Sequence, residues 1–178
     1  MPTLEQRVQR LEDLAQITAM TMQLARHFDN GYHPDGVISL FTEDGVFDGG
    51  PFGRHEGIAA IRGFFAGITE QITFAKHHLA THVIDLAADG RTATGQWYMW
   101  GTHTVGGEAM FLALTWDMHY RKPDGRWLIS AQRLDWQFLT PPRRRLGQDP
   151  DGRLSAPVSS AAHAPRVSDR RPPDGAGH

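Results

Sequence analysis

The chain contains 178 residues, which is enough for one well-buried domain and too few for two ordinary ones. Hydrophobic residues make up 40% and charged residues 21% of the sequence, and the net charge is −2. This describes a globular protein without the basic excess that nucleic acids or membrane surfaces attract. The sequence has no cysteine, so disulfides, thiolate nucleophiles and cysteine metal ligands are excluded. It has neither an apolar signal segment at its start nor a run of about 18 apolar residues, and we expect a cytoplasmic protein.

Residues 3–28 are predicted to form one long amphipathic helix. Its apolar side chains recur at steps of three and four residues, which places them on one stripe: Leu4, Val8, Leu11, Leu14, Ile17, Met20 and Leu24. Thr3 and Gln6 resemble a capping box, and Gly31 suits the left-handed end of a helix. Asp29 would then lie at the helix end, where the dipole disfavours a carboxylate without a donor. The alternative role for Asp29 is a turn residue that bonds only its own backbone.

Shorter elements follow this helix, and then a run of strands. A second helix is expected over 37–41, a strand over 45–50 and a third helix over 56–70. Tight glycine turns separate four long strands, which predicts a curved antiparallel meander over 73–87, 91–104, 109–121 and 126–138. The fold class is therefore α+β, with three N-terminal helices packed on a curved antiparallel sheet. Residues 1–140 would form this domain, and the proline- and arginine-rich residues 141–178 are predicted to be disordered.

The first long strand carries several histidines into an apolar sheet. Side chains alternate between the faces of a strand, which predicts one face made of His78, Ala80, His82, Ile84 and Leu86. Both faces of the strand are mostly apolar beyond residue 79, so at least one histidine is expected to point into the interior, where a titratable ring needs a partner. The question for the rest of the chain is what partners His78. By the same alternation His77 is expected at the surface or in a subunit interface. His103 and His119 are interpreted as sheet-edge or interface residues.

Three segments carry a family resemblance, at 40–47 (LFTEDGVF), 54–61 (RHEGIAAI) and 120–129 (YRKPDGRWLI). With the order of elements, they resemble the SnoaL-like group of the NTF2-like superfamily over about residues 5–140. That group includes scytalone dehydratase, a bile-acid dehydratase and hexachlorocyclohexane dehydrochlorinase. The resemblance implies a cone-shaped fold, in which the curved sheet wraps a pocket and the helices close its wide end.

The resemblance also implies a catalytic site. Several members use an Asp–His dyad as general base, with the Asp at the end of the first helix and the His on the first long strand, positions held here by Asp29 and His78. Arg133 on the last strand is similar in position to the arginine that assists in the dehydrochlorinase. The alternative for Arg133 is an ion pair on the strand face with Asp117 or Asp135.

A neutral imidazole accepts a proton well near pH 7 when a carboxylate holds its other nitrogen. The expected function is therefore a cofactor-free lyase or isomerase, of dehydratase or cyclase type, for a small, mostly apolar cyclic substrate. Substrate-binding side chains would be His82 and a set of aromatic and methionine residues: Phe47, Phe64, Trp97, Met99, Phe111, Trp116 and Trp136.

Two other functions are open. The chain could be a non-catalytic NTF2-like module that binds a small ligand or a partner protein, as the β-subunit of ring-hydroxylating dioxygenases does. It could also be an epoxide hydrolase that assembles Arg133, Asp117 and Asp135 around a water. No cofactor is expected, and no metal site, because His78 and His82 are about 13 Å apart on a strand. We expect a homodimer or a trimer formed through the open face of the sheet.

Overall fold

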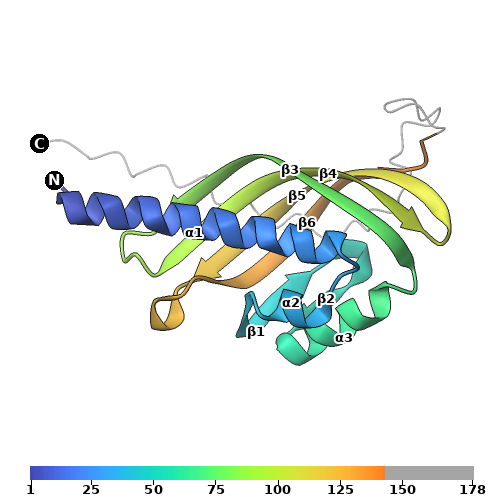
Figure 1. The fold of residues 1–178 in the computed structure, drawn as a ribbon, viewed down its shortest axis with the longest axis horizontal. Coiled ribbons are helices and arrows are strands. Elements are labelled where there is room, and N and C mark those ends of the chain that lie inside the picture. The colour runs from blue at the N-terminus through green and yellow to red at the C-terminus, as the bar shows by residue number, and fades with distance from the viewer. Residues whose placement is uncertain (143–178) are drawn as a thin grey trace, which may run out of the picture.

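The computed structural model of the protein describes residues 1–142, and the predicted disordered tail lies almost wholly outside them. In this part of the chain the helices are α1 (Leu4–Asp29), α2 (Pro34–Ile38) and α3 (Ile58–Ile68). The strands are β1 (Phe41–Asp48), β2 (Arg54–Glu56), β3 (Ile72–Leu86), β4 (Thr92–Val105), β5 (Glu108–Arg121) and β6 (Leu128–Thr140). Two short 3-10 turns lie at Gly50–Phe52 and Pro123–Gly125. The helices lie on one side of a curved, unclosed sheet (Figure 1).

The sheet has the strand order β2-β1-β6-β5-β4-β3. The antiparallel meander from β3 to β6 is as predicted. The prediction of an antiparallel sheet is wrong in one respect, because strand β1 pairs in parallel with β6. A strand ahead of the third helix was expected, and β1 and β2 both precede α3 in the chain. The α+β class is confirmed, with a mixed sheet.

Helix α1 begins and ends at the residues that its capping chemistry dictates. The Gln6 backbone N–H donates to Thr3 Oγ1 at 3.2 Å, and the Thr3 N–H donates to Gln6 Oε1 at 2.9 Å, which completes the capping box. Gly31 follows the helix with a φ of +81°, a conformation that favours glycine. The apolar stripe is buried only in its second half, at Ile17, Met20 and Leu24. The N-terminal end of α1 extends past the sheet (Figure 1), and residues 4–12 are exposed, so the first half of the stripe does not pack on the sheet.

Two buried polar clusters fasten α1 to the sheet. The Thr21 hydroxyl lies 2.9 Å from Tyr120 Oη, which also accepts from Trp97 Nε1 at 3.0 Å. Nearer the N-terminus, Asp13 Oδ1 accepts from Lys122 Nζ at 2.5 Å and Trp127 Nε1 at 2.9 Å. Both clusters join residues about a hundred positions apart, so they set the position of the helix across the sheet.

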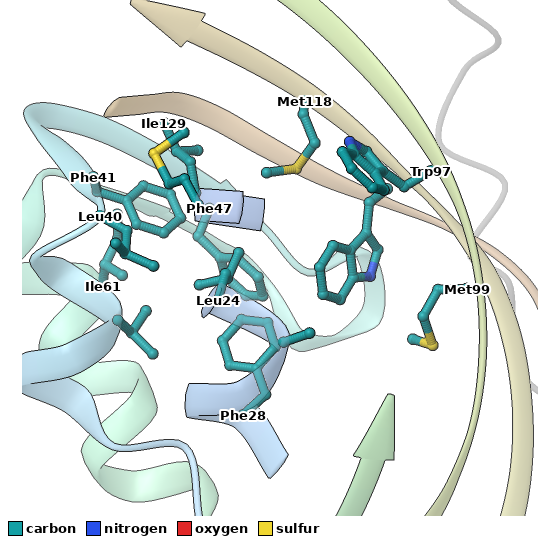
Figure 2. Close-up of a cluster of buried hydrophobic side chains, with 14 of the residues drawn as sticks. Leu24, Phe28, Leu40, Phe41, Phe47, Ile61, Trp97, Met99, Met118 and Ile129 are labelled. Atoms are coloured by element: carbon teal, nitrogen blue, oxygen red, sulfur yellow. The ribbon is translucent and has the colours of Figure 1, made fainter. Parts of the chain in front are cut away.

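The hydrophobic core fills the layer between the helices and the inner face of the sheet. Figure 2 shows Phe28 and Phe47 in this layer, with Trp97 and Met99 directed toward it from β4. All four side chains are at most 3% exposed. This layer contains the space in which a site can form.

Strand β3 contains a bulge that changes which of its residues point inward. Leu79 pairs with Met99, and the next pair is His82 with Trp97, so β3 uses three steps where β4 uses two. The extra residue reverses the alternation. Residues His77 and Leu79 before the bulge therefore share the inner face with Ile84 and Leu86 after it.

Candidate functional site

Asp29 and His77 form the central contact of the site. The His77 backbone N–H donates to Asp29 Oδ1 at 2.8 Å, and ring Nδ1 lies 2.9 Å from the same oxygen. Lys76 Nζ lies 3.6 Å from Asp29 Oδ2. Strand β3 is an edge strand of the sheet. A backbone N–H on its unpaired side, away from β4, is therefore free to bond the end of α1. The carboxylate thereby obtains the donors that its position at a helix C-terminus requires.

The electrostatics of the pair define the tautomer of the ring. Partial burial raises the pKa of Asp29, but the hydrogen bonds from His77 and the charge of Lys76 outweigh it and hold the pKa below its ordinary value. Burial lowers the pKa of His77, and Asp29 offsets only part of that effect. Asp29 is therefore ionised and His77 neutral at pH 7. Because an ionised carboxylate only accepts, Nδ1 carries the ring proton and Nε2 keeps a lone pair.

A cavity of about 40 Å³ lies beside the His77 ring. Its lining is mostly aromatic and apolar, contributed by α1, α3 and the inner face of the sheet: Phe28, Tyr32, Phe47, Phe52, Phe64, Phe65, Ile68, Ile72, Met99, Leu114, Trp116, Leu134 and Trp136, with His77 and His103. A volume of this size holds a few water molecules and no cyclic organic molecule. Most of the side chains that surround it are aromatic rings.

Two further polar side chains line this cavity, and the sequence reasoning assigned neither to the site. His103 is 6% exposed, its ring centroid lies 4.9 Å from that of His77, and its Nε2 is buried without a hydrogen-bond partner among the described residues. Burial lowers the pKa of His103 to about 3, so the ring is neutral. Burial and then the charge of Asp29 raise the pKa of Tyr32, which keeps its phenol protonated. Strand β4 has no bulge in its pairing with β5, so alternate residues from the buried Trp97 share the inner face of the sheet, and this alternation includes His103.

The expected contact between Asp29 and His78 is wrong. His78 lies on the outer face of the sheet, stacked on Trp100 with 4.6 Å between the ring centroids. The prediction took His78 from the family resemblance and grouped it with Ile84 and Leu86 by strict alternation. It missed the bulge between Leu79 and His82, which shifts the phase by one residue. His77, expected at the surface, is the ring that meets Asp29, and its side chain is only 4% exposed.

The predicted lining is partly gathered around the cavity. Phe47, Phe64, Met99, Trp116 and Trp136 all line it. The other predicted residues do not line it: His82, Trp97, Phe111 and Arg133.

Trp97 is buried and bonded to Tyr120 away from the cavity lining, and the exposed His82 stacks on it with 4.1 Å between the ring centroids. Phe111 is 37% exposed and does not line the cavity. Arg133 lies on the outer face opposite Asp117, in a second hollow whose lining residues are all different from those of the cavity. The expected positions of His82, Trp97, Phe111 and Arg133 in the pocket are therefore wrong.

Residues 1–142 lack two features that would point to other functions. No cluster of three or more His, Asp or Glu side chains in this range is arranged to hold a metal ion. None of the helices in it has the length and apolar character needed to cross a bilayer.

The sequence matches the SnoaL-like domain over residues 9–133, which is well over half of the chain. The protein therefore belongs to the SnoaL-like domain family, as the resemblance predicted. No curated protein matches the sequence.

Solved structures share the fold at low sequence identity. A protein from Novosphingobium aromaticivorans named as an aromatic ring hydroxylase superposes with a TM-score of 0.68 at 25% identity, over 74% of this chain and 94% of its own. A second protein from that organism, named as a scytalone dehydratase, superposes with a TM-score of 0.69 at 22% identity, over 78% of this chain and 93% of its own. Hexachlorocyclohexane dehydrochlorinase LinA-type3 from Novosphingobium barchaimii superposes with a TM-score of 0.71 at 14% identity, over 78% of this chain and 96% of its own. At these identities the likeness concerns the fold.

Proposed function

We propose that the protein is a cofactor-free lyase or isomerase in which Asp29 and His77 act together as the general base. The observation that carries the proposal is the hydrogen bond from His77 Nδ1 to Asp29, 2.9 Å long, beside an apolar cavity. A buried imidazole held in one tautomer by a carboxylate is the arrangement that proton abstraction near pH 7 requires. The membership of the family and the dehydratase- and dehydrochlorinase-named neighbours support the same reaction class.

The proposed step transfers a proton from a carbon next to an activating group of the substrate to His77 Nε2. The bonding electrons left on that carbon either form a double bond as a leaving group departs, or return with the proton to another position. Asp29 stabilises the imidazolium that forms and keeps the ring oriented. Tyr32 and His103 are neutral, and a neutral phenol or imidazole N–H can donate a hydrogen bond to an oxygen that gains negative charge.

The lining restricts the substrate to a small, mostly apolar molecule with one or two polar groups. The space of about 40 Å³ is too small for a ring, so binding of a cyclic substrate requires aromatic side chains such as Phe64 or Trp136 to move. This movement is part of the proposal and is open to a crystallographic check with a bound ligand.

The test is a screen of the purified protein against small cyclic β-hydroxy ketones, halides and enones. His77→Gln should lower kcat/KM by about 10²- to 10⁴-fold, the usual contribution of a positioned base. His78→Gln is the matched control, because it changes the neighbouring histidine on the outer face, and it should keep the parent rate. Equal rates for His77→Gln and the parent would contradict the assignment of the base.

A second candidate function is a non-catalytic module that binds a small apolar ligand. The observation that favours it is the small size of the cavity, about 40 Å³, with Trp116 and Trp136 in its lining. Under this alternative, ligands bind to the parent and to His77→Gln with similar affinity, and neither protein turns them over.

A further inference from the structure

The first half of α1 presents apolar side chains to solvent. Leu4 is 72% exposed, Val8 45% and Leu11 66%, and all three lie on one face of the helix. The stripe continues toward the C-terminus through Ala15 and the 51% exposed Met22. These residues, from Leu4 to Met22, are called the outer seam below. Three large exposed hydrophobic side chains in line on one helix are unusual on a monomer surface.

The outer seam has the spacing of a coiled coil. Leu4 and Leu11 are seven residues apart, and Val8 falls between them, four after the first and three before the second. This corresponds to leucine at heptad position d and valine at position a, the combination that favours two parallel strands. Ala15 and Met22 continue position a by sevens.

The outer seam faces away from the rest of the protein. Asp13 and Met20, which occupy position f of the same heptads, are 3% and 8% exposed against the sheet side. Position f is opposite the a and d positions on the helix. Residues 4–12 are all exposed, so a second helix can lie along this first half of the outer seam. Farther along, the fully buried Ile17 and Thr21 fall at positions c and g, which places the domain beside the helix as well as behind it.

The charges beside the outer seam are complementary for one orientation. Glu5 and Glu12 flank it at position e, and Arg7 flanks it at position g on the other side. In a parallel pair, position g of one helix meets position e of the next heptad of its partner, so Arg7 would meet Glu12 of a second copy. In an antiparallel pair the flanks meet like with like, which would place glutamates opposite glutamates.

We propose that the outer seam of α1 is a dimer interface, at which two copies of this chain pair as a parallel two-stranded coiled coil. The seam is short, but Asp13 and Thr21 already anchor α1 to the sheet. The helix is thus folded before it pairs, and pairing avoids the nucleation cost that makes isolated short helices unstable. This surface differs from the open face of the sheet that was expected to form the interface.

Cross-linking tests the orientation directly, because the chain contains no cysteine of its own. Leu4→Cys should form a disulfide-linked dimer on mild oxidation, since equivalent positions meet only in the parallel pair. Arg10→Cys, on an exposed position away from the outer seam, is the matched control and should remain monomeric on denaturing gels. An antiparallel pair would instead set position d opposite position a, so that Leu4 meets Ala15 of the second copy. Failure of Leu4→Cys to cross-link alone, together with cross-linking in a mixture with Ala15→Cys, would overturn the parallel arrangement.

Sedimentation velocity of the full chain tests the surface. The fraction of dimer in the parent should rise with protein concentration, and Leu11→Glu should raise the Kd by about tenfold or more, because it places a charge in the seam. Arg7→Glu and Glu12→Arg should each raise it about fivefold, and the double swap should restore it. A monomeric parent would overturn the proposal. The proposal would also be overturned if Trp100→Glu, on the outer face of the sheet, abolished the dimer and Leu11→Glu left its Kd unchanged.

Discussion

At the scale of single residues, the position of Asp29 explains why the site forms where it does. A carboxylate at the C-terminal end of a helix is disfavoured by the helix dipole and needs donors to remain there. The backbone and ring of His77 supply two hydrogen bonds, and Lys76 adds a charge. The same bonds hold the His77 ring against the cavity, so one carboxylate both fastens the helix to the sheet and orients the proposed base.

His103 predicts a pH dependence of stability. Its pKa falls from 6.5 to about 3 on folding, so between these values the unfolded chain binds a proton that the folded chain does not. Stability is therefore fully present above pH 6.5 and is lost as the pH falls toward 3. The loss amounts to at most about 1.4 kcal/mol for each pH unit.

The measurement is urea unfolding of the parent and of His103→Phe between pH 6.5 and 4. The variant should show a shallower decline of the free energy of unfolding with falling pH, because phenylalanine has no proton to gain. Identical slopes would mean that the His103 ring takes up its proton in the folded protein.

Sequence reasoning at this scale succeeded for Asp29 and failed by one residue for its partner. The capping signals and the break at Gly31 place Asp29 from local chemistry alone. The choice between His77 and His78 depends on the bulge between Leu79 and His82, where neither proline nor glycine marks the irregularity. The phase of β3 is therefore set by pairing with β4, which local sequence does not encode.

At the scale of elements, the approach of β3 to β4 depends on a glycine. Gly101 pairs with His77, and a Cβ at Gly101 would lie 2.3 Å from the carbonyl oxygen of Lys76. That oxygen belongs to the backbone beside the dyad, so it cannot move aside without moving His77. The geometry of the proposed base thus depends on the absence of a side chain on the neighbouring strand.

Gly101→Ala should therefore destabilise the protein by about 1–3 kcal/mol through overpacking, and it should also lower the rate of any His77-dependent reaction. Gly63→Ala is the matched control, because that glycine lies within α3 with nothing near its Cβ position. The control should gain up to about 1 kcal/mol from helix propensity. Urea unfolding measures both variants, and a Gly101→Ala protein as stable as the parent would contradict the close approach.

The elements themselves were predictable to different degrees. Helix α1 and the meander β3–β6 follow from periodicity and turn residues, and both are present. The parallel pairing of β1 with β6 was not predicted, because it joins segments about eighty residues apart that carry no local signal of each other. The second helix begins at Pro34, earlier than predicted, since proline suits the first turn and His33 caps it through Nδ1.

At the scale of the whole molecule, the family and the fold agree with each other. The SnoaL-like domain covers residues 9–133, and the curved sheet with helices on one side agrees with it. Folds of this kind host unrelated functions, so the reaction must be argued from the site. The proposed reaction therefore depends on the pairing of Asp29 with a neutral His77 beside the cavity.

The most direct test of that pairing is an NMR titration of the His77 ring nitrogens in the parent and in Asp29→Asn. In the parent, the signals should show a neutral ring with the proton on Nδ1 and a titration midpoint below 6.5, because burial outweighs the effect of Asp29. Since Asp29 raises the pKa of His77, its replacement by asparagine should move the midpoint still lower. An unchanged midpoint in Asp29→Asn, or a proton on Nε2 in the parent, would contradict the central claim.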